Sequence, residues 1–220
     1  MGLMTTEKME GLILEKDKQL LEKDLLIKET HHRVKNGLQI IASILRLQMR
    51  RSDSSEAKSG FQASVDRILA ISAVQDLYSR LSEDAIEVKT IIDKVSQDAL
   101  SSYKQAHQNI TCEAVGSDVK ISYSKAVPVA LLTNELMSNA LRHGIKNDDS
   151  GAIRIVISEK ENSIVIAVFD SGKMNLDFGP PDESKLGLQI VKALAEEQLQ
   201  GSFFLTRENN QTKAELIFKK

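Results

Sequence analysis

The 220-residue sequence has no tryptophan, only three prolines and a single cysteine, Cys112. One cysteine excludes an intramolecular disulfide and a cysteine metal cluster, so we expect Cys112 to be a small core residue. No apolar run approaches the roughly 20 residues that a membrane-spanning helix needs, and the N-terminus lacks a signal-peptide pattern. Lys and Arg number 29 against 31 Asp and Glu, without the basic excess of nucleic-acid-binding proteins. We therefore expect a soluble, cytoplasmic segment that binds no nucleic acid and does not insert into a membrane.

The N-terminal quarter has the pattern of a long helix that pairs with other helices. No proline interrupts residues 7–51, and apolar residues recur at every seventh position: Ile13, Leu20, Ile27, Val34 and Ile41. A sustained heptad repeat is typical of a coiled coil. After a loop at 51–56, residues 56–81 carry a second broad apolar stripe. These segments predict a helical hairpin, and two copies joined across the heptad seam would form a four-helix bundle and hence a homodimer.

Strand-like and helical segments alternate in the rest of the chain. We expect strands at 85–88, 110–115, 119–123, 153–157, 164–169, 203–207 and 213–218, and helices at 89–104, 125–145 and 186–198. Residues 174–185 contain a Gly-Pro-Pro-Asp run and predict a loop. Interleaved strands and helices imply a sheet with one face covered by helices. The predicted fold class is α+β, a dimerising helical hairpin followed by an α/β sandwich, with the domain boundary near residues 81–86.

Two adjacent histidines lie in the heptad segment, and helical geometry separates them. At about 100° per residue, His31 falls at the edge of the apolar face and His32 points outward. Glu29 and Asn36 flank His32 at about one turn on either side. A carboxylate beside an exposed imidazole can hold its tautomer and accept its proton, as a histidine nucleophile requires. A surface histidine without a function has the same neighbours, so the spacing alone leaves both interpretations open.

A second group of polar residues follows one stripe of the predicted helix 125–145. Glu135 and Asn139 are one turn apart, and Arg142 and His143 lie one turn further on. Carboxylate and amide oxygens are suitable ligands for Mg²⁺, and polar donors on the same stripe can contact its phosphates. A solvent-exposed polar face would show the same pattern, so the stripe by itself does not decide between the two.

Two glycine-containing segments complete the candidate site. Asp170 ends an apolar strand just before Gly172, and a carboxylate fixed there can accept a hydrogen bond from an exocyclic amine. Gly187 precedes a helix, whose free N–H groups suit phosphate binding. Each pattern alone is also typical of an ordinary turn or helix start. The order of the four parts along the chain is more specific than any one of them.

This order resembles the catalytic core of the sensor histidine kinases. Residues 29–48 (ETHHRVKNGLQIIASILRLQ) resemble the H-box of the subgroup with a His-Arg-x-x-Asn pattern. The segment NELMSNALRH resembles the N-box of the Bergerat (GHKL) ATP-binding fold, and the segments DSG and KLGLQIVKALAEEQLQG resemble its two glycine boxes. The resemblance covers about residues 25–218, and the first two motifs together are highly specific.

The resemblance implies a role for each candidate residue. His32 matches the phospho-acceptor, and the helical geometry described above places Glu29 to orient or deprotonate its ring. Glu135 matches the acidic residue that assists proton removal, Asn139 the Mg²⁺ ligand, and Asp170 the carboxylate that recognises the adenine amine. Other positions match residues near the nucleotide: Arg142, His143, Gly172, Gly187 and Leu188.

The implied activity is autophosphorylation of His32 by ATP and Mg²⁺, followed by transfer to an aspartate of a response-regulator receiver domain. Residues 1–28 would be a signalling coiled-coil helix leading from an upstream sensor domain. Residues 29–82 would form the dimerisation and phosphotransfer hairpin, and residues 83–220 the ATP-binding domain.

The sequence also departs from the family pattern. The first glycine box usually reads Asp-x-Gly-x-Gly, but Met174 occupies its last position, and Gln75 stands where a histidine is common in this subgroup. The absence of tryptophan disfavours the related Trp-x-Glu subgroup. Two alternatives therefore remain. One is a GHKL-type ATPase or serine kinase without histidine phosphorylation, and the other is a dimeric scaffold with a degenerate site.

Overall fold

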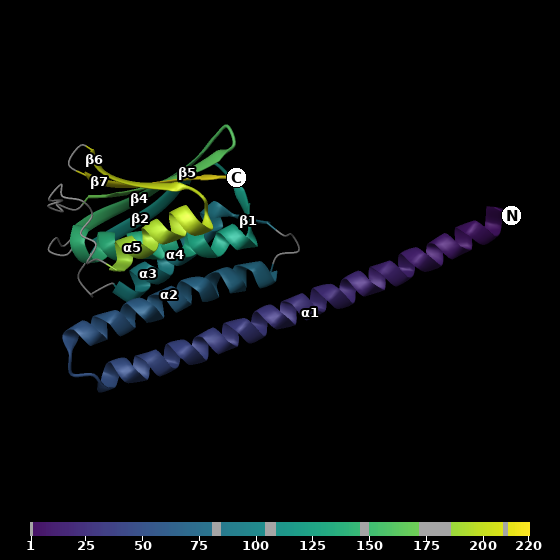
Figure 1. The fold of residues 1–220 in the computed structure, drawn as a ribbon, viewed down its shortest axis with the longest axis horizontal. Coiled ribbons are helices and arrows are strands. Elements are labelled where there is room, and N and C mark those ends of the chain that lie inside the picture. Colours follow the sequence, from purple (N-terminus) through teal and green to yellow (C-terminus); the bar gives the residue numbers. More distant parts are fainter. Residues whose placement is uncertain (1, 81–84, 104–108, 146–149, 172–185, 209–210) are drawn as a thin grey trace.

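The computed structural model describes residues 2–80, 85–103, 109–145, 150–171, 186–208 and 211–220. Helix α1 (Gly2–Arg51) is continuous over 50 residues and extends far beyond the rest of the molecule (Figure 1). Helix α2 (Ser55–Arg80) returns alongside its second half. The Ser54 hydroxyl accepts a hydrogen bond from the Ala57 N–H at 3.2 Å, which caps the start of α2. The predicted helical hairpin is confirmed, with its turn at residues 52–54.

The heptad positions of α1 remain in contact with solvent. Their exposed fractions range from 42% for Val34 to 59% for Leu20, and Ile13, Ile27 and Ile41 lie between these values. Helix α2 covers a different side of α1, because Ala42 is almost completely buried. The single chain therefore leaves an apolar seam that the predicted dimer would bury.

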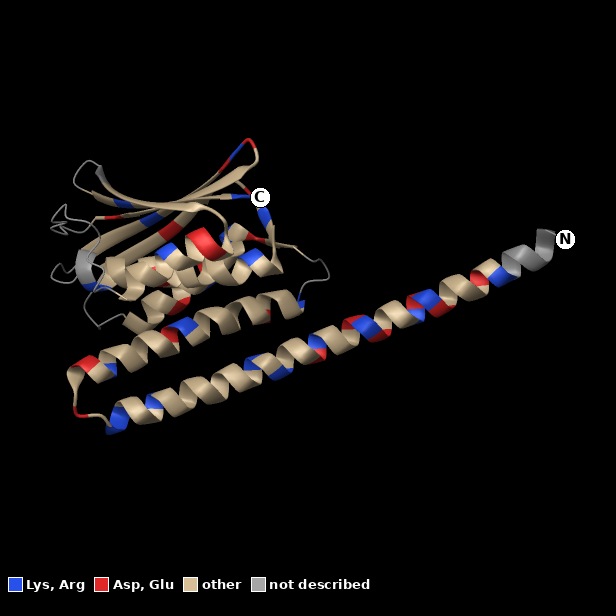
Figure 2. Ribbon diagram, viewed as in Figure 1, with Lys and Arg blue, Asp and Glu red and all other residues tan. Residues whose placement is uncertain are grey.

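Charged residues of both signs are distributed along the extended part of α1 (Figure 2). They alternate with the apolar seam, as on a solvated helix of a coiled coil. In the part of the chain that the structure describes, no helix has both the length and the hydropathy of a membrane span.

The second half of the chain forms an α/β layer. The main sheet has the strand order β2-β4-β5-β7-β6, in which only β2 and β4 are parallel. Its strands are β2 (Asn109–Gly116), β4 (Ser150–Lys160), β5 (Ser163–Asp170), β6 (Ser202–Glu208) and β7 (Gln211–Lys219). A separate two-stranded sheet pairs β1 (Ala85–Glu87) with β3 (Lys120–Ser122). All seven predicted strands are present, whereas the split into two sheets was not predicted.

Helices cover one face of the main sheet, between the sheet and the hairpin (Figure 1). They are α3 (Val88–Tyr103), α4 (Tyr123–Asn139) and α5 (Leu186–Ala193). Helices α4 and α5 each continue into a five-residue π-helical turn, Ala140–Gly144 and Leu194–Gln198. Helix α4 is buried on most sides because it contacts α2, α3 and α5. The predicted α+β fold is therefore confirmed, and α4 lies at the junction of its two parts.

Candidate functional site

The two adjacent histidines face different environments. The His31 Nδ1–H donates to Oε1 of the buried Gln75 at 2.5 Å, a direction fixed by the amide oxygen, which can only accept. The His31 ring also makes edge-on contacts with Tyr78 and Tyr123, at centroid distances of 5.3 and 5.8 Å. His32 is exposed. The structure thus places His31 inward and His32 outward, in agreement with the helical geometry of the sequence.

Gln75 links the histidine helix to the sheet domain. Its Nε2–H donates to the hydroxyl of Tyr123, the first residue of α4. Burial raises the pKa of the Tyr123 hydroxyl above its usual value, so this group stays neutral. The three side chains of His31, Gln75 and Tyr123 connect α1, α2 and α4 in one line of contacts.

The Glu29 carboxylate has a partner other than His32. Its Oε1 accepts from Arg33 Nε at 3.1 Å and from Arg33 Nη2 at 2.6 Å. Arg33 lies four residues on, a spacing that favours such pairs on a helix surface. Both side chains are exposed, so the pair is weak and exchanges readily. The expected action of Glu29 on the His32 ring stays a prediction.

The structure brings together three predicted residues from two separate motifs. Glu135 and Asn139 lie one turn apart on α4, and Gly187 is the second residue of α5. A Cβ atom at Gly187 would lie 2.9 Å from Glu135 Oε2 and 3.8 Å from Asn139 Oδ1. A side chain at position 187 would therefore crowd the carboxylate. The N-terminal turn of α5, including Leu188, approaches the polar groups of α4 at this point.

Glu135 is buried, which corrects the alternative of a solvent-exposed polar face. It is 6% exposed, and both its oxygens accept hydrogen bonds from Arg67 of α2, Oε1 from Nε at 2.8 Å and Oε2 from Nη2 at 3.0 Å. This two-point geometry is the strong form of a carboxylate–guanidinium pair. The sequence analysis missed Arg67, whose only signal was a charge next to the apolar stripe of the second helix.

Asp170 lies at the end of β5, where the sequence places it. It is 7% exposed, and its neighbours across the sheet are Ile153 on β4 and Thr212 on β7. Just beyond it, the Ala152 N–H donates to the Ser171 hydroxyl at 3.0 Å, which fixes the strand end. Gly172 and Met174 lie outside the described residues, as does the side chain of His143.

Arg142 contacts the hairpin. Its Nη1 donates to the Ser59 hydroxyl at 3.0 Å, and its Nη2 lies 3.8 Å from Asp66 Oδ2. Burial raises the pKa of the Asp66 carboxyl above its usual value, and the Gln62 hydrogen bond and the Arg142 charge offset this only partly. The Arg142 side chain extends toward α2 in this arrangement, and its predicted place near the phosphates stays a prediction.

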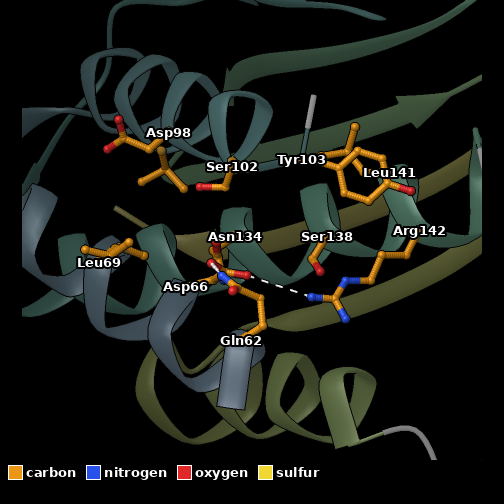
Figure 3. A pocket seen from close by; sticks show the side chains of 13 residues that line it. Gln62, Asp66, Leu69, Asp98, Ser102, Tyr103, Asn134, Ser138, Leu141 and Arg142 are labelled. Carbon is orange, nitrogen blue, oxygen red and sulfur yellow. Dashed lines mark hydrogen bonds and ion pairs between the residues drawn. The ribbon is translucent and has the colours of Figure 1, made fainter. Parts of the chain in front are cut away.

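A pocket lies at this junction of α2, α3 and α4 (Figure 3). Figure 3 shows Asp66 and Arg142 facing each other across its edge, with Asn134 and Ser138 of α4 beside them. Its other walls are apolar and polar residues of α2 and α3, including Leu69, Asp98, Ser102 and Tyr103. The junction between hairpin and sheet domain therefore contains a cavity lined by both apolar and polar side chains.

Family models match both parts of the chain. Residues 29–103 match a family described as "Histidine kinase", and residues 96–214 match one described as "Histidine kinase-like ATPase domain". The chain belongs to the histidine kinases. In this histidine kinase core, the first match contains His32 and the second contains Glu135, Asn139, Asp170 and Gly187.

The curated relatives agree with this family. The chain is 30% identical to the sensor histidine kinase PdtaS of Mycolicibacterium smegmatis over 85% of its own length and 38% of the relative's. It is 25% identical to a blue-light-activated histidine kinase 2 of Erythrobacter litoralis, over 80% of this chain and 51% of the relative. The chain thus spans about two fifths to one half of the length of these relatives.

The fold of this histidine kinase core is similar to a solved one. The histidine kinase domain of a blue-light-activated histidine kinase from Erythrobacter litoralis superposes with a TM-score of 0.62 at 18% identity, covering 90% of this chain and 94% of that domain. The similarity includes both the hairpin and the ATPase-like domain, since it covers nearly the whole of each chain.

Proposed function

We propose that this chain is the core of a two-component sensor histidine kinase. It phosphorylates its own His32 from Mg-ATP and passes the phosphoryl group to an aspartate of a response-regulator receiver domain. One observation carries the proposal: the same chain has an exposed histidine on a helical hairpin and a cluster of Glu135, Asn139 and Gly187 in an ATPase-like domain.

The cluster has the chemistry that a magnesium nucleotide needs. The Asn139 Oδ1 atom is a hard oxygen ligand, and Mg²⁺ is commonly held by one or two such protein groups together with substrate phosphates. Free N–H groups at the start of α5, at Gly187 and Leu188, suit the phosphate oxygens. Bound Mg²⁺ would neutralise charge on the transferring phosphoryl group. Asp170 would accept a hydrogen bond from the adenine amine.

His32 would supply the nucleophile. A ring nitrogen attacks the γ-phosphorus, the new N–P bond forms as the bond to the ADP oxygen breaks, and the ring proton passes to a carboxylate. We assign that proton to Glu135, with Glu29 orienting the ring once it is released from Arg33. Replacing Asn139 with Asp tests the nucleotide site, because Mg-ATP affinity measured by calorimetry should fall while the fold is retained.

The exposed heptad seam supports a parallel homodimer through α1. A monomer would leave an apolar stripe in water, with Leu20 59% exposed and Ile13 56% exposed, whereas pairing of two copies buries it. Light scattering at micromolar concentration should give the mass of a dimer or a larger assembly. Lys substitutions at Ile13 and Leu20 should shift the mass toward the monomer, and a monomeric native protein would contradict this assignment.

We assign residues 1–28 to a signalling helix, 29–82 to the dimerisation and phosphotransfer hairpin, and 83–220 to the ATP-binding domain. The relatives are longer than this chain, and we place a sensor domain upstream of the signalling helix in a longer protein. We place this core in the cytoplasm, where ATP and receiver domains are found. A nucleotide titration combined with an autophosphorylation assay distinguishes the proposed histidine kinase from the two alternatives. A GHKL-type ATPase or serine kinase would bind nucleotide without labelling histidine, and a scaffold would bind no nucleotide.

A further inference from the structure

Helix α4 is fastened to helix α2 at two separate levels. At one level, Gln75 of α2 donates to Tyr123 at the start of α4, beside His31. At the other level, Arg67 of α2 forms the two-point ion pair with the buried Glu135 of α4. The hairpin therefore reaches directly into the cluster that we assign to the nucleotide phosphates.

These two levels are far apart along the helices. Arg67 and Gln75 are eight residues apart on α2, which corresponds to about 12 Å at 1.5 Å per residue. Tyr123 and Glu135 are twelve residues apart on α4, or about 18 Å. The His31 ring contacts the Tyr123 ring. The adjacent His32 therefore lies near the Tyr123 end of α4 and far from Glu135.

Phosphoryl transfer cannot occur across such a gap. The proposed reaction brings the His32 ring to Glu135 and the nucleotide phosphates, with reacting atoms about 3–3.5 Å apart. In the docked arrangement, by contrast, the levels of His32 and Glu135 are separated by about 12–18 Å along the helices. In a parallel bundle the twofold axis runs along the helices, so the partner's copy of position 32 would lie at the same height. The docked arrangement of hairpin and sheet domain is therefore unable to transfer the phosphoryl group within a chain or between chains, and α4 must leave α2 first.

We propose that Arg67 is a positioning residue of the kinase reaction that acts through Glu135. It holds the nucleotide-binding helix on the hairpin in a docked state without transfer, and this inference rests on the proposed function. The ion pair also occupies the carboxylate that would receive the ring proton. Separation of Arg67 from Glu135 both frees the sheet domain to move and makes Glu135 available as a base.

The surroundings of the pair fit a contact that opens. The neighbouring contacts of Arg142 with Ser59 and Asp66 are also polar, and the cavity lies beside them (Figure 3). Glu135 Oε2 lies next to Gly187, within the proposed phosphate site. Mg²⁺ bound there would attract the carboxylate and compete with the guanidinium for it, so bound Mg-ATP would weaken the pair.

The test compares Arg67→Gln, Arg67→Lys and the control Arg80→Gln. Arg80 also lies on α2 and pairs with a carboxylate, but its partner Asp76 is on the same helix. Spin labels at Lys58 of α2 and Lys192 of α5, both exposed, report docking in a Cys112→Ser background by pulsed distance measurement. The charge-swapped pair Arg67→Glu with Glu135→Arg is measured for distance only, since Glu135 belongs to the proposed catalytic machinery.

We expect Arg67→Gln to broaden and lengthen the docked distance and to raise the initial rate of autophosphorylation up to about tenfold, the most that an open state populated at about 10% allows. Arg67→Lys should fall between native and Arg67→Gln, and Arg80→Gln should match the native protein. Arg67→Glu alone and Glu135→Arg alone should each lose the docked distance between the two spin labels, and the double variant should restore it. An unchanged distance in Arg67→Gln, or a rate equal to or below that of the native protein, overturns the proposal. If the native protein is not labelled at all, the proposed function fails, while the distances still decide whether Arg67 holds the docked state.

Discussion

Removing the imidazole at position 31 or at position 32 should affect stability very differently, although the residues are adjacent. In His31→Ala, Oε1 of Gln75 loses its donor in a site where Gln75 is 7% exposed, and an unsatisfied buried acceptor costs about 1–3 kcal/mol. Two edge-on ring contacts, with Tyr78 and Tyr123, are lost as well, at about 0.5–1.5 kcal/mol each when well packed. Because His31 is only half-buried, we expect a loss of about 2–4 kcal/mol.

The matched variant His32→Ala removes the same atoms from an exposed position. The gain in helix propensity is equal in the two variants, so the difference between them isolates the tertiary contacts of His31. Urea denaturation followed by circular dichroism, at one fixed protein concentration because a dimer's stability depends on it, should give His32→Ala within about 0.5 kcal/mol of native. Equal losses in the two variants, or an unchanged His31→Ala, would refute the assignment of His31 to the interior.

Three further perturbations test other parts of the molecule. Gly187→Ala should lower ATP affinity about tenfold by calorimetry, a loss of roughly 1.4 kcal/mol, because its methyl group would lie 2.9 Å from Glu135 Oε2; unchanged affinity would place the nucleotide elsewhere. Asp170→Asn should reduce the preference for ATP over GTP in competition binding, since an amide offers a donor where adenine also offers one; equal binding of the two nucleotides by the native protein would exclude this role. The hydrogen bond from Lys35 holds the pKa of the Asp76 carboxyl below its usual value, so the pair contributes stability above about pH 4–5 that is lost as the pH falls through the lower folded-state pKa. Asp76→Asn should cost about 1 kcal/mol at pH 7 and should flatten the decline of stability in acid, and a variant with the native acid profile would contradict that assignment.

The sequence predicted the elements well because local patterns determine them. The heptad repeat leaves a periodic signal, whereas the polar turn at 52–54 and the β-branched strand that ends at Asp170 leave a signal in their composition. The same regularity placed His32 outward and His31 inward, since both positions follow from rotation along one helix. The Glu135–Gly187 contact was anticipated only through the family resemblance, because 52 residues separate these positions in the sequence.

The parts that sequence reasoning missed are long-range partnerships. Nothing near Arg67 indicates that it meets Glu135, because the pair depends on how α2 packs against α4. The contact of Arg142 with Ser59 of α2 was likewise not predicted, for the same reason. The parallel pairing of β2 with β4 likewise depends on a connection through α4 and not on either strand's own residues.

The most direct test of the kinase assignment is phosphoryl labelling of the native protein and of two single variants with γ-labelled Mg-ATP. His31 lies among Gln75, Tyr78 and Tyr123, where a phosphoryl group with about −1.5 to −2 charges would disrupt packing, whereas His32 is open to solvent. We expect native protein and His31→Gln to acquire a label that is labile in acid and stable in base, as for a phosphoramidate, and His32→Gln to acquire none while keeping its oligomeric mass. Label retained in His32→Gln but lost in His31→Gln would reverse the assignment of the acceptor, and acid-stable label in all three proteins would contradict histidine phosphorylation itself.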